Sequence, residues 1–242
     1  MSTLFISDLH LDDSRPQITA LFEHYLASDE VRDADALYIL GDLVEAWIGD
    51  DDDAELPRRI AAATRAVCES GVPVYFMVGN RDFLLGEDYA RRAGFELLED
   101  GTVHELYGRP TLLMHGDVLC TDDLAYQAVR KQVRTPAWKA QILAMPLEAR
   151  RAFAAKSRAE SRAHTGNTME AIMDVNADAV ADAMRKAGTT RLIHGHTHRP
   201  AIHRLALDGQ PAERIVLGDW YEQGSVLHVD ADGVELRGLP PA

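Results

Sequence analysis

Five short fragments of this chain combine carboxylates, imidazoles and an amide, which are side chains that bind transition-metal ions. In chain order they are Asp8-Leu9-His10, Gly41-Asp42, Gly79-Asn80-Arg81-Asp82, His115-Gly116-Asp117 and Gly195-His196-Thr197-His198. None of them contains a cysteine. Such a donor set suits Mn²⁺, Fe²⁺ or Zn²⁺ better than Ca²⁺, which takes oxygen ligands, or a thiolate zinc site. The fragments therefore suggest a metal centre.

Spacing supports this interpretation. Asp8 with His10, and His196 with His198, are i, i+2 pairs, and in extended chain such residues point to the same side. We therefore expect each pair to reach one metal ion, with the neighbouring glycines allowing close approach of the backbone. Each fragment alone is weak evidence, because Gly-Asp turns and single histidines after strands are common for structural reasons. The ordered set of five is specific.

The predicted strands bring the five fragments together. Short apolar runs occupy 4–6, 36–40, 72–78, 111–114, 191–193 and 215–217, and helical patterns occupy 18–27 and 57–70. Alternating strands and helices imply parallel strands with right-handed crossovers. Each fragment follows one of the runs, and the carboxyl ends of parallel strands share one edge, where ligands bind. Asp208-Gly209 and Asp232-Gly233 predict antiparallel hairpins near the C-terminus.

The stretch from about 122 to 187 has no strand signal, and we predict that it is a helical insertion divided by Pro136 and Pro146. Apolar residues near helical spacing are Trp138, Ile142, Leu143, Leu147 and Phe153. Residues 130–163 carry nine basic and two acidic side chains, a net +7, whereas the remaining 208 residues carry −21. This basic block suggests an anionic partner, either a phosphorylated substrate or an acidic membrane face; a solvated helix surface is the alternative.

Length and composition limit the class of protein. The 242 residues are enough for one large α/β domain, and 46% apolar and 26% charged residues are ordinary for a globular protein. Two cysteines give no disulfide framework and fit a reducing cytosol. No apolar run approaches the roughly 20 residues of a membrane span, and the first residues lack the features of a signal peptide. The net charge of −14 argues against non-specific nucleic-acid binding.

The order and spelling of the fragments resemble the calcineurin-like metallophosphoesterases, whose pattern is D-x-H, G-D, G-N-H-[DE], H and G-H-x-H. The resemblance runs from Asp8 to His198, and Arg81 stands where many members have histidine. Other segments are similar to the lipid A branch of this family, the UDP-2,3-diacylglucosamine diphosphatases: SDLHL, GDLVEAWIGDD, GNRDFLLG, HGDVLCTDD, IMDVN and HGHTHRPAIH. The resemblance implies one domain over residues 1–242, a four-layer α/β/β/α sandwich, with the insertion as a lid.

The resemblance also implies a centre of two Mn²⁺ ions. Asp8, His10 and His198 would hold the first ion and Asn80, His115 and His196 the second, with Asp42 as the bridge. Two such ions lie about 3.5–4 Å apart and hold a hydroxide at neutral pH. In this branch the hydroxide attacks the α-phosphorus of UDP-2,3-diacylglucosamine, releasing UMP and 2,3-diacylglucosamine 1-phosphate.

Catalytic roles fall by resemblance on Asp42, Arg81 and His196. Because arginine stays charged, we expect Arg81 to stabilise transition-state charge rather than donate a proton. A structural salt bridge between Arg81 and Asp82 is the alternative.

The implied substrate contacts are Asn80, Arg81, Asp123, Ser161, Thr165, Thr168 and His196. Thr165 and Thr168 stand where the family usually has Asn and Lys, so they keep hydrogen-bonding hydroxyls without the positive charge, for which Arg158 or Arg162 could compensate. The implied partners are the lipid-linked nucleotide sugar and an anionic inner-membrane surface, with the protein peripheral on its cytoplasmic side. No nucleic acid is expected.

Another calcineurin-like phosphoesterase, acting on a soluble nucleotide or a phosphoprotein, is the alternative function. A non-catalytic scaffold is disfavoured because all seven ligand positions are filled. The acidic run from Asp50 to Asp53 lacks EF-hand spacing, and we interpret it as a solvated loop. His194 shares the phase of His196 and His198, and only the family pattern excludes it.

Overall fold

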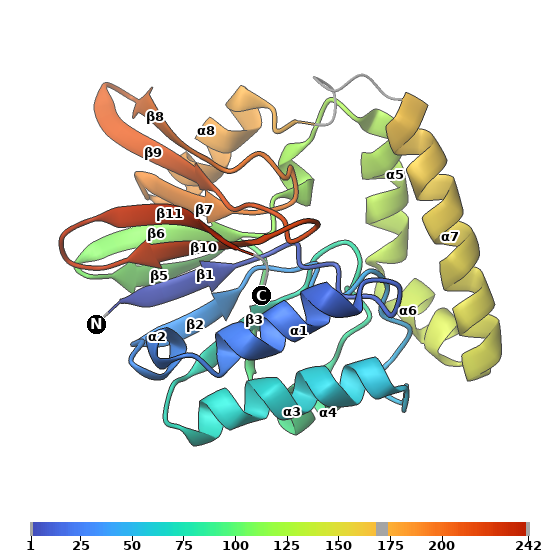
Figure 1. The fold of residues 1–242 in the computed structure, drawn as a ribbon. Helices are drawn as coiled ribbons and strands as arrows, with labels where there is room; N and C mark the ends of the chain where they lie inside the picture. The colour runs from blue at the N-terminus through green and yellow to red at the C-terminus, as the bar shows by residue number, and fades with distance from the viewer. Residues whose placement is uncertain (1, 168–173, 241–242) are drawn as a thin grey trace.

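Two β-sheets pack face to face in the computed structural model, which describes residues 2–167 and 174–240 (Figure 1). The first sheet has the strand order β11-β10-β1-β2-β3-β4 and the second β5-β6-β7-β9-β8. The strands are β1 (Thr3–Ile6), β2 (Ala36–Ile39), β3 (Val74–Met77), β4 (Glu96–Leu98), β5 (Thr102–Leu106), β6 (Arg109–Met114), β7 (Arg191–His194), β8 (Ala201–Leu207), β9 (Gln210–Val216), β10 (Gly224–Val229) and β11 (Val234–Leu239).

Helices cover the outer faces of both sheets and one end of the sandwich. They are α1 (Pro16–Leu26), α2 (Asp29–Arg32), α3 (Glu55–Glu69), α4 (Glu87–Ala93), the short 3₁₀ helix η1 (Asp117–Leu119), α5 (Leu124–Val133), α6 (Pro136–Leu143), α7 (Leu147–Asn167) and α8 (Ala177–Ala187). Figure 1 shows α1, α3 and α4 along the first sheet and α5 to α7 standing at the end of the sandwich.

Three apolar clusters separate four layers. One joins α1, α3 and α4 to the first sheet and includes Phe22 and Tyr89. The second lies between the sheets and includes Phe5 and Ile193. The third joins the second sheet to α8 through Met184 and its neighbours. The predicted four-layer α/β/β/α sandwich is confirmed.

The local predictions follow the observed elements closely. Strands β1, β2 and β3 are parallel neighbours, with α1 and α3 in the connections between them. Asp208 and Gly209 join antiparallel β8 and β9, and both have positive φ, 52° and 79°, as a type I′ turn requires. Strands β10 and β11 form the second predicted hairpin.

The insertion differs in extent from the predicted range 122–187. Helices α5, α6 and α7 stand apart from the sheets, but α8 packs on the second sheet through Val180 and Met184. Pro136 opens α6 as predicted, and α7 begins just after Pro146. No helix among the described residues is long and apolar enough to cross a membrane.

Arginines of the basic block dock the insertion on the core. Arg130 of α5 and Arg134, directly after this helix, both reach Asp117, with N–O distances of 2.8 and 3.2 Å. Further pairs of this kind are Arg130 with Asp100, Arg150 with Asp51, Arg151 with Asp52 and Arg158 with Glu45. Much of the positive charge of the insertion is therefore matched by core carboxylates within the molecule.

The acidic run that begins at Asp50 is consequently not the solvated loop that the sequence suggested. The Asp50 carboxylate accepts hydrogen bonds from the indole N–H of Trp47 and the backbone N–H groups of Gly86 and Tyr89. Asp51 and Asp52 bind arginines of α7. The run ties α4 and the insertion to one loop.

Candidate metal centre

The loops that carry the five fragments bind one another through their backbones. Each loop follows a strand that ends at the same edge: β1, β2, β3, β6 or β7. The Asp8 N–H donates to the Gly41 carbonyl (3.0 Å), the His10 N–H to the Asp42 carbonyl (2.9 Å), and the Gly195 N–H to the His115 carbonyl (2.9 Å). Ligand positions far apart in sequence are thus fixed by main-chain hydrogen bonds.

Six of the predicted ligands form two clusters, each with its donor atoms within 4.8 Å of one another. They are Asp8, His10 and His198 in the first and Asp42, His115 and His196 in the second. In the first, the Nε2 atoms of His10 and His198 are 3.2 Å apart, and His198 Nε2 is 3.4 Å from Asp8 Oδ1.

Asp42 belongs to the second cluster and also faces the first. Its Oδ2 atom is 3.7 Å from His10 Nε2, and its Oδ1 atom is 3.7 Å from His115 Nε2. The seventh predicted ligand, Asn80, places its Oδ1 atom 3.0 Å from the same His115 Nε2. The arrangement suits a carboxylate shared by two ions.

The backbone at these ligands is left-handed rather than extended. The φ angle is 55° at Asp8, 48° at His10, 53° at Asp42, 70° at His196 and 56° at His198. Strands β1 and β7 end before the paired ligands, so the expectation that the pairs lie in extended chain is wrong. Such angles cost about 1–3 kcal/mol at each non-glycine residue and persist only where the surroundings impose them.

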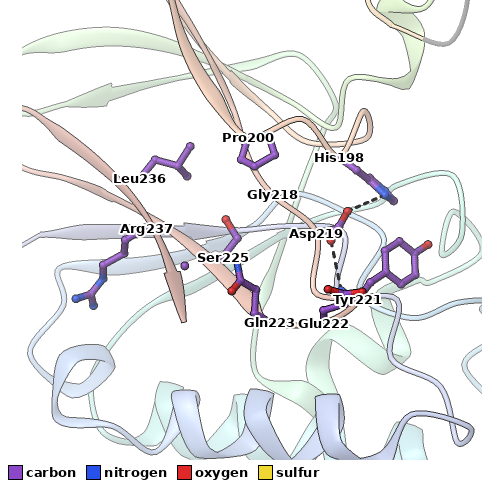
Figure 2. Close-up of a pocket in the computed structure, with 11 residues that line it drawn as sticks. His198, Pro200, Gly218, Asp219, Tyr221, Glu222, Gln223, Ser225, Leu236 and Arg237 are labelled. Carbon is purple, nitrogen blue, oxygen red and sulfur yellow. Dashed lines mark hydrogen bonds and ion pairs between the residues drawn. The ribbon is translucent and has the colours of Figure 1, made fainter. Parts of the chain in front are cut away.

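Oxygen atoms outside the clusters lie next to Nδ1 of three of the imidazole rings and favour one orientation of each ring. His10 Nδ1 is 3.1 Å from Glu45 Oε2, and His198 Nδ1 is 3.2 Å from Asp219 Oδ2 (Figure 2). His115 Nδ1 is 2.9 Å from the Leu40 carbonyl oxygen. With Nδ1 facing these oxygens, Nε2 of each ring faces the clusters, as in protein metal sites. Sequence analysis missed Glu45 and Asp219, because nothing in their spacing marks them.

Two glycines leave room for the carboxylates. A Cβ atom on Gly79 would lie 2.2 Å from Asp42 Oδ1, and one on Gly195 would lie 2.3 Å from Asp8 Oδ2. Asp82 orders the same loop by accepting hydrogen bonds from the Gly79 N–H (2.6 Å) and the Leu43 N–H (2.7 Å). Burial, with the nearby Asp42 charge, raises the pKa of Asp82 to about 7.

The donor set fits divalent cations. The buried Asp8 Oδ1 atom has no hydrogen-bond partner among the described residues. Burial lowers the pKa of His196 to about 4, which leaves an uncharged imidazole able to bind a metal. At His115 burial also acts to lower the pKa, but the charges of Asp42, Asp117 and Asp8 outweigh it and raise the pKa to about 9. The site therefore draws in positive charge, which a metal ion would supply.

Comparison with known proteins decides the family. The calcineurin-like phosphoesterase family matches residues 1–200. This chain belongs to that family. The phosphoesterase is 58% identical to a UDP-2,3-diacylglucosamine hydrolase of Xanthomonas oryzae pv. oryzae (strain PXO99A), with 98% of each chain covered. It is 56% identical to one from Cellvibrio japonicus (strain Ueda107), again over 98% of each. The predicted resemblance is confirmed.

Solved structures share the fold of this phosphoesterase at low sequence identity. A dimetal phosphatase from Danio rerio matches with a TM-score of 0.51 and 13% identity, covering 100% of this chain and 96% of the other. An archaeal phosphodiesterase matches with a TM-score of 0.50 and 12% identity over 99% and 100% of the two chains.

A cleft of about 680 Å³ connects the metal ligands to the insertion. Arg81 lies in it with its Nε atom 3.9 Å from Asp42 Oδ2, and its guanidinium donates to the Ser161 hydroxyl of α7 at 3.3 Å. The alternative salt bridge between Arg81 and Asp82 is not formed, because Asp82 binds backbone N–H groups. The Arg81 guanidinium therefore faces the cleft.

Of the other predicted substrate-binding residues, some line the cleft and others lie outside the described part of the structure. Asp123 lines the cleft and caps α5 by accepting from the Tyr126 N–H at 2.9 Å. Thr165 lies on the last turns of α7, and its side chain is outside the described part of the structure, as is the whole of Thr168. His194 is buried, with Nδ1 2.8 Å from the Gly195 carbonyl oxygen, and is in neither cluster.

A second cavity, of about 670 Å³, lies on the other side of His198 and Tyr221 (Figure 2). Both side chains line this cavity and the metal cleft. They form part of the partition between the two spaces.

Proposed function

We propose that this phosphoesterase hydrolyses the pyrophosphate bond of UDP-2,3-diacylglucosamine to UMP and 2,3-diacylglucosamine 1-phosphate, in lipid A biosynthesis. The observation that carries the proposal is the convergence of all seven predicted ligand side chains beside one cleft, which five of them line. Full-length relatives that bear this substrate in their names support it.

Asp8, His10 and His198 would hold one Mn²⁺ ion, and Asn80, His115 and His196 the other, with Asp42 shared. When bound, two such ions activate water near neutral pH and stabilise charge on phosphoryl oxygens. The chain itself supplies orientation: Glu45 and Asp219 hold His10 and His198, and backbone hydrogen bonds hold the loops.

Among the side chains of the cleft, Arg81 is best placed to stabilise the negative charge that develops on the phosphoryl oxygens in the transition state. Its guanidinium faces the cleft beside Asp42, and the Ser161 contact holds it against α7. A cation fixed at this point can bind the phosphoryl oxygens as their negative charge grows. Asn80, Asp123, Ser161 and His196 would contact the diphosphate and sugar from the walls of the same cleft, with Thr165 and Thr168 completing the contacts on the insertion side.

The insertion would act as a lid that takes up the acyl chains. Apolar side chains are exposed on it: Leu124 is 78% and Val129 56% exposed, and Leu143 and Phe153 are also exposed. Ile142, by contrast, is buried, and Trp138 packs near Phe153 at 6.0 Å between ring centroids. We place the protein peripherally on the cytoplasmic side of the inner membrane, held more by this apolar surface than by charge, because arginines of the basic block bind core carboxylates.

Product analysis with the purified enzyme tests the function. Incubation of the UDP-sugar lipid with enzyme and Mn²⁺ should give UMP and the lipid 1-phosphate, and removal of metal by a chelator should stop the reaction. Release of free phosphate, or activity only on soluble phosphodiesters and phosphoproteins, would favour the alternative member of the family.

Deletion tests the lid. Replacing residues 137–163 by a short Gly/Ser linker should spare hydrolysis of a soluble phosphodiester and remove most activity on the lipid substrate. Pelleting with anionic vesicles should also weaken. Near wild-type cleavage of the lipid by the folded, metal-loaded deletion variant would contradict the lid.

A further inference from the structure

Four arginines line the metal cleft, and they differ in their partners. Arg158 donates to Glu45 at 2.7 Å, and Arg199 donates to Asp174 at 2.7 Å, so both are paired with carboxylates. Arg81 lies beside Asp42 and has been given a role at the phosphoryl group. For Arg15, no carboxylate of the described residues lies within ion-pair distance. Its charge is therefore available to a bound anion.

The Arg15 side chain is nevertheless held in place. Its Cζ atom lies 4.7 Å from the centroid of the Tyr221 ring, and its Nη2 atom donates to the His10 carbonyl oxygen. Its Nη1 atom is buried and has no hydrogen-bond partner in the described structure. A buried N–H group without a partner is costly, so a ligand that accepts from it gains binding energy.

Tyr221 completes a wall beside the first ligand cluster. Its ring lies 5.2 Å from that of His10, with an interplanar angle of 10°, and 5.4 Å from that of His198. The Tyr221 phenol lines the cleft and can donate a hydrogen bond to a ligand there. We name this pair the Arg15–Tyr221 wall.

The cleft is lined by two chemically different sets of residues. Asp123, Tyr126, Arg158 and Ser161 come from the insertion, whose helices also carry exposed apolar residues. Asp12, Ser14 and the Arg15–Tyr221 wall come from the core. Helix α1 begins directly after Arg15, with no acidic residue in its first turn, so its N-terminus adds positive potential on the core side.

We propose that the Arg15–Tyr221 wall binds the nucleotide half of the substrate, with Arg15 Nη1 donating to an oxygen of the nucleotide phosphate. The inference rests on the proposed function and names the part of the cleft that each half occupies. Acyl chains require the apolar surface of the insertion. On the core side the Arg15 cation and the Tyr221 phenol suit a phosphate, and the Asp12 carboxylate, which accepts from Ser14, can also accept from ribose hydroxyls.

Product inhibition of the full-length, Mn²⁺-loaded enzyme tests this assignment. In Arg15→Ala the inhibition constant of UMP should rise by about tenfold to a hundredfold, as expected for the loss of one charge-assisted hydrogen bond. The inhibition constant of 2,3-diacylglucosamine 1-phosphate and the metal content should stay at wild-type values. Arg15→Lys should recover part of the UMP affinity, and Tyr221→Leu should lose a smaller part.

Arg58→Ala is the matched control, because Arg58 is exposed on α3, away from the cleft. An unchanged UMP constant in Arg15→Ala, a rise for the lipid product instead, or loss of metal would each overturn the inference. Calorimetric titration of UMP into the same variants gives this result without any lipid turnover. Failure of the wild-type enzyme to cleave the lipid substrate would instead refute the proposed function, so the two failures are distinguishable.

Discussion

Removal of the Arg150 guanidinium should loosen the insertion without destabilising the strands that carry the metal ligands. The side chain is 4% exposed and makes a buried set of contacts. It donates to the Ile48 carbonyl at 2.6 Å, the Met145 carbonyl at 3.0 Å and the Asp51 carboxylate at 2.7 Å. Arg150→Met keeps the apolar stem and removes all of these hydrogen bonds.

The expected loss of free energy holding the insertion on the core depends on how exposed each hydrogen-bond partner of Arg150 is. Asp51 is 63% exposed and is rehydrated, so its share is that of a surface pair, about 0–1 kcal/mol. The Ile48 and Met145 carbonyl groups lose a charged donor, at about 1–2 kcal/mol each once partial hydration is allowed for. The sum is about 2–5 kcal/mol, enough to make local opening of the insertion much more frequent.

Hydrogen exchange measured by mass spectrometry can show which segments are destabilised in Arg150→Met. Peptides from α6 and α7 should exchange about thirtyfold or more faster in Arg150→Met, while those from β1 to β3 keep wild-type rates. Lipid-substrate activity should fall, and hydrolysis of a soluble diester should persist. Lys156→Met is the control, because the Lys156 side chain is 76% exposed and its partner, Glu160, lies on the same helix. Equal destabilisation of the β1 to β3 peptides, or unchanged α7 exchange, would refute the reasoning.

Three further substitutions test the centre itself. Asp42→Ala should abolish turnover and lower metal content below two ions per chain, measured by elemental analysis; full activity with two ions bound would sink the bridging role. Arg81→Ala should lower turnover by about 10²–10³ with normal metal content, and Arg81→Lys should recover only part; metal loss would indicate a structural role. Glu45→Gln should weaken Mn²⁺ binding by about 10–100-fold in a metal titration, because His10 loses its charged partner; unchanged binding would contradict that contact.

The metal-binding side chains could be predicted from the sequence because their residue types and their order along the chain are read from it directly. Each fragment follows a buried strand, and parallel strands bring such fragments to one edge. The conformation of the loops was not predictable in the same way. Positive φ angles at Asp8 and His10 depend on hydrogen bonds to Gly41 and Asp42, which lie on another loop. The i, i+2 spacing thus indicated correctly that Asp8 and His10 share a cluster, but the extended backbone assumed for them was wrong.

The carboxylates beside the metal-binding histidines and the ion pairs of the insertion could not be predicted from the sequence, because they too depend on contacts between distant segments. Glu45 and Asp219 act on His10 and His198 only after the chain has folded, and no local pattern distinguishes them from surface acids. Counting charges found the basic block correctly, but the partners of Arg150 and Arg158 lie about a hundred residues earlier in the sequence. A charge count gives the sign of a region and cannot say which charges are already neutralised.

The loop between β2 and α3 joins the two parts of the site. It carries Asp42, which faces both ligand clusters, and Glu45, whose two oxygens contact different partners: Oε2 faces His10 at 3.1 Å and Oε1 accepts from Arg158 of α7 at 2.7 Å. Farther along, Asp51 binds Arg150 of the same helix. Because one carboxylate contacts both a metal ligand and the insertion, movement of α7 away from the core would free Oε1 of Glu45 and leave Oε2 beside His10. The first ligand cluster can therefore keep its outer contact when the insertion opens, which is why hydrolysis of a soluble diester should persist in Arg150→Met.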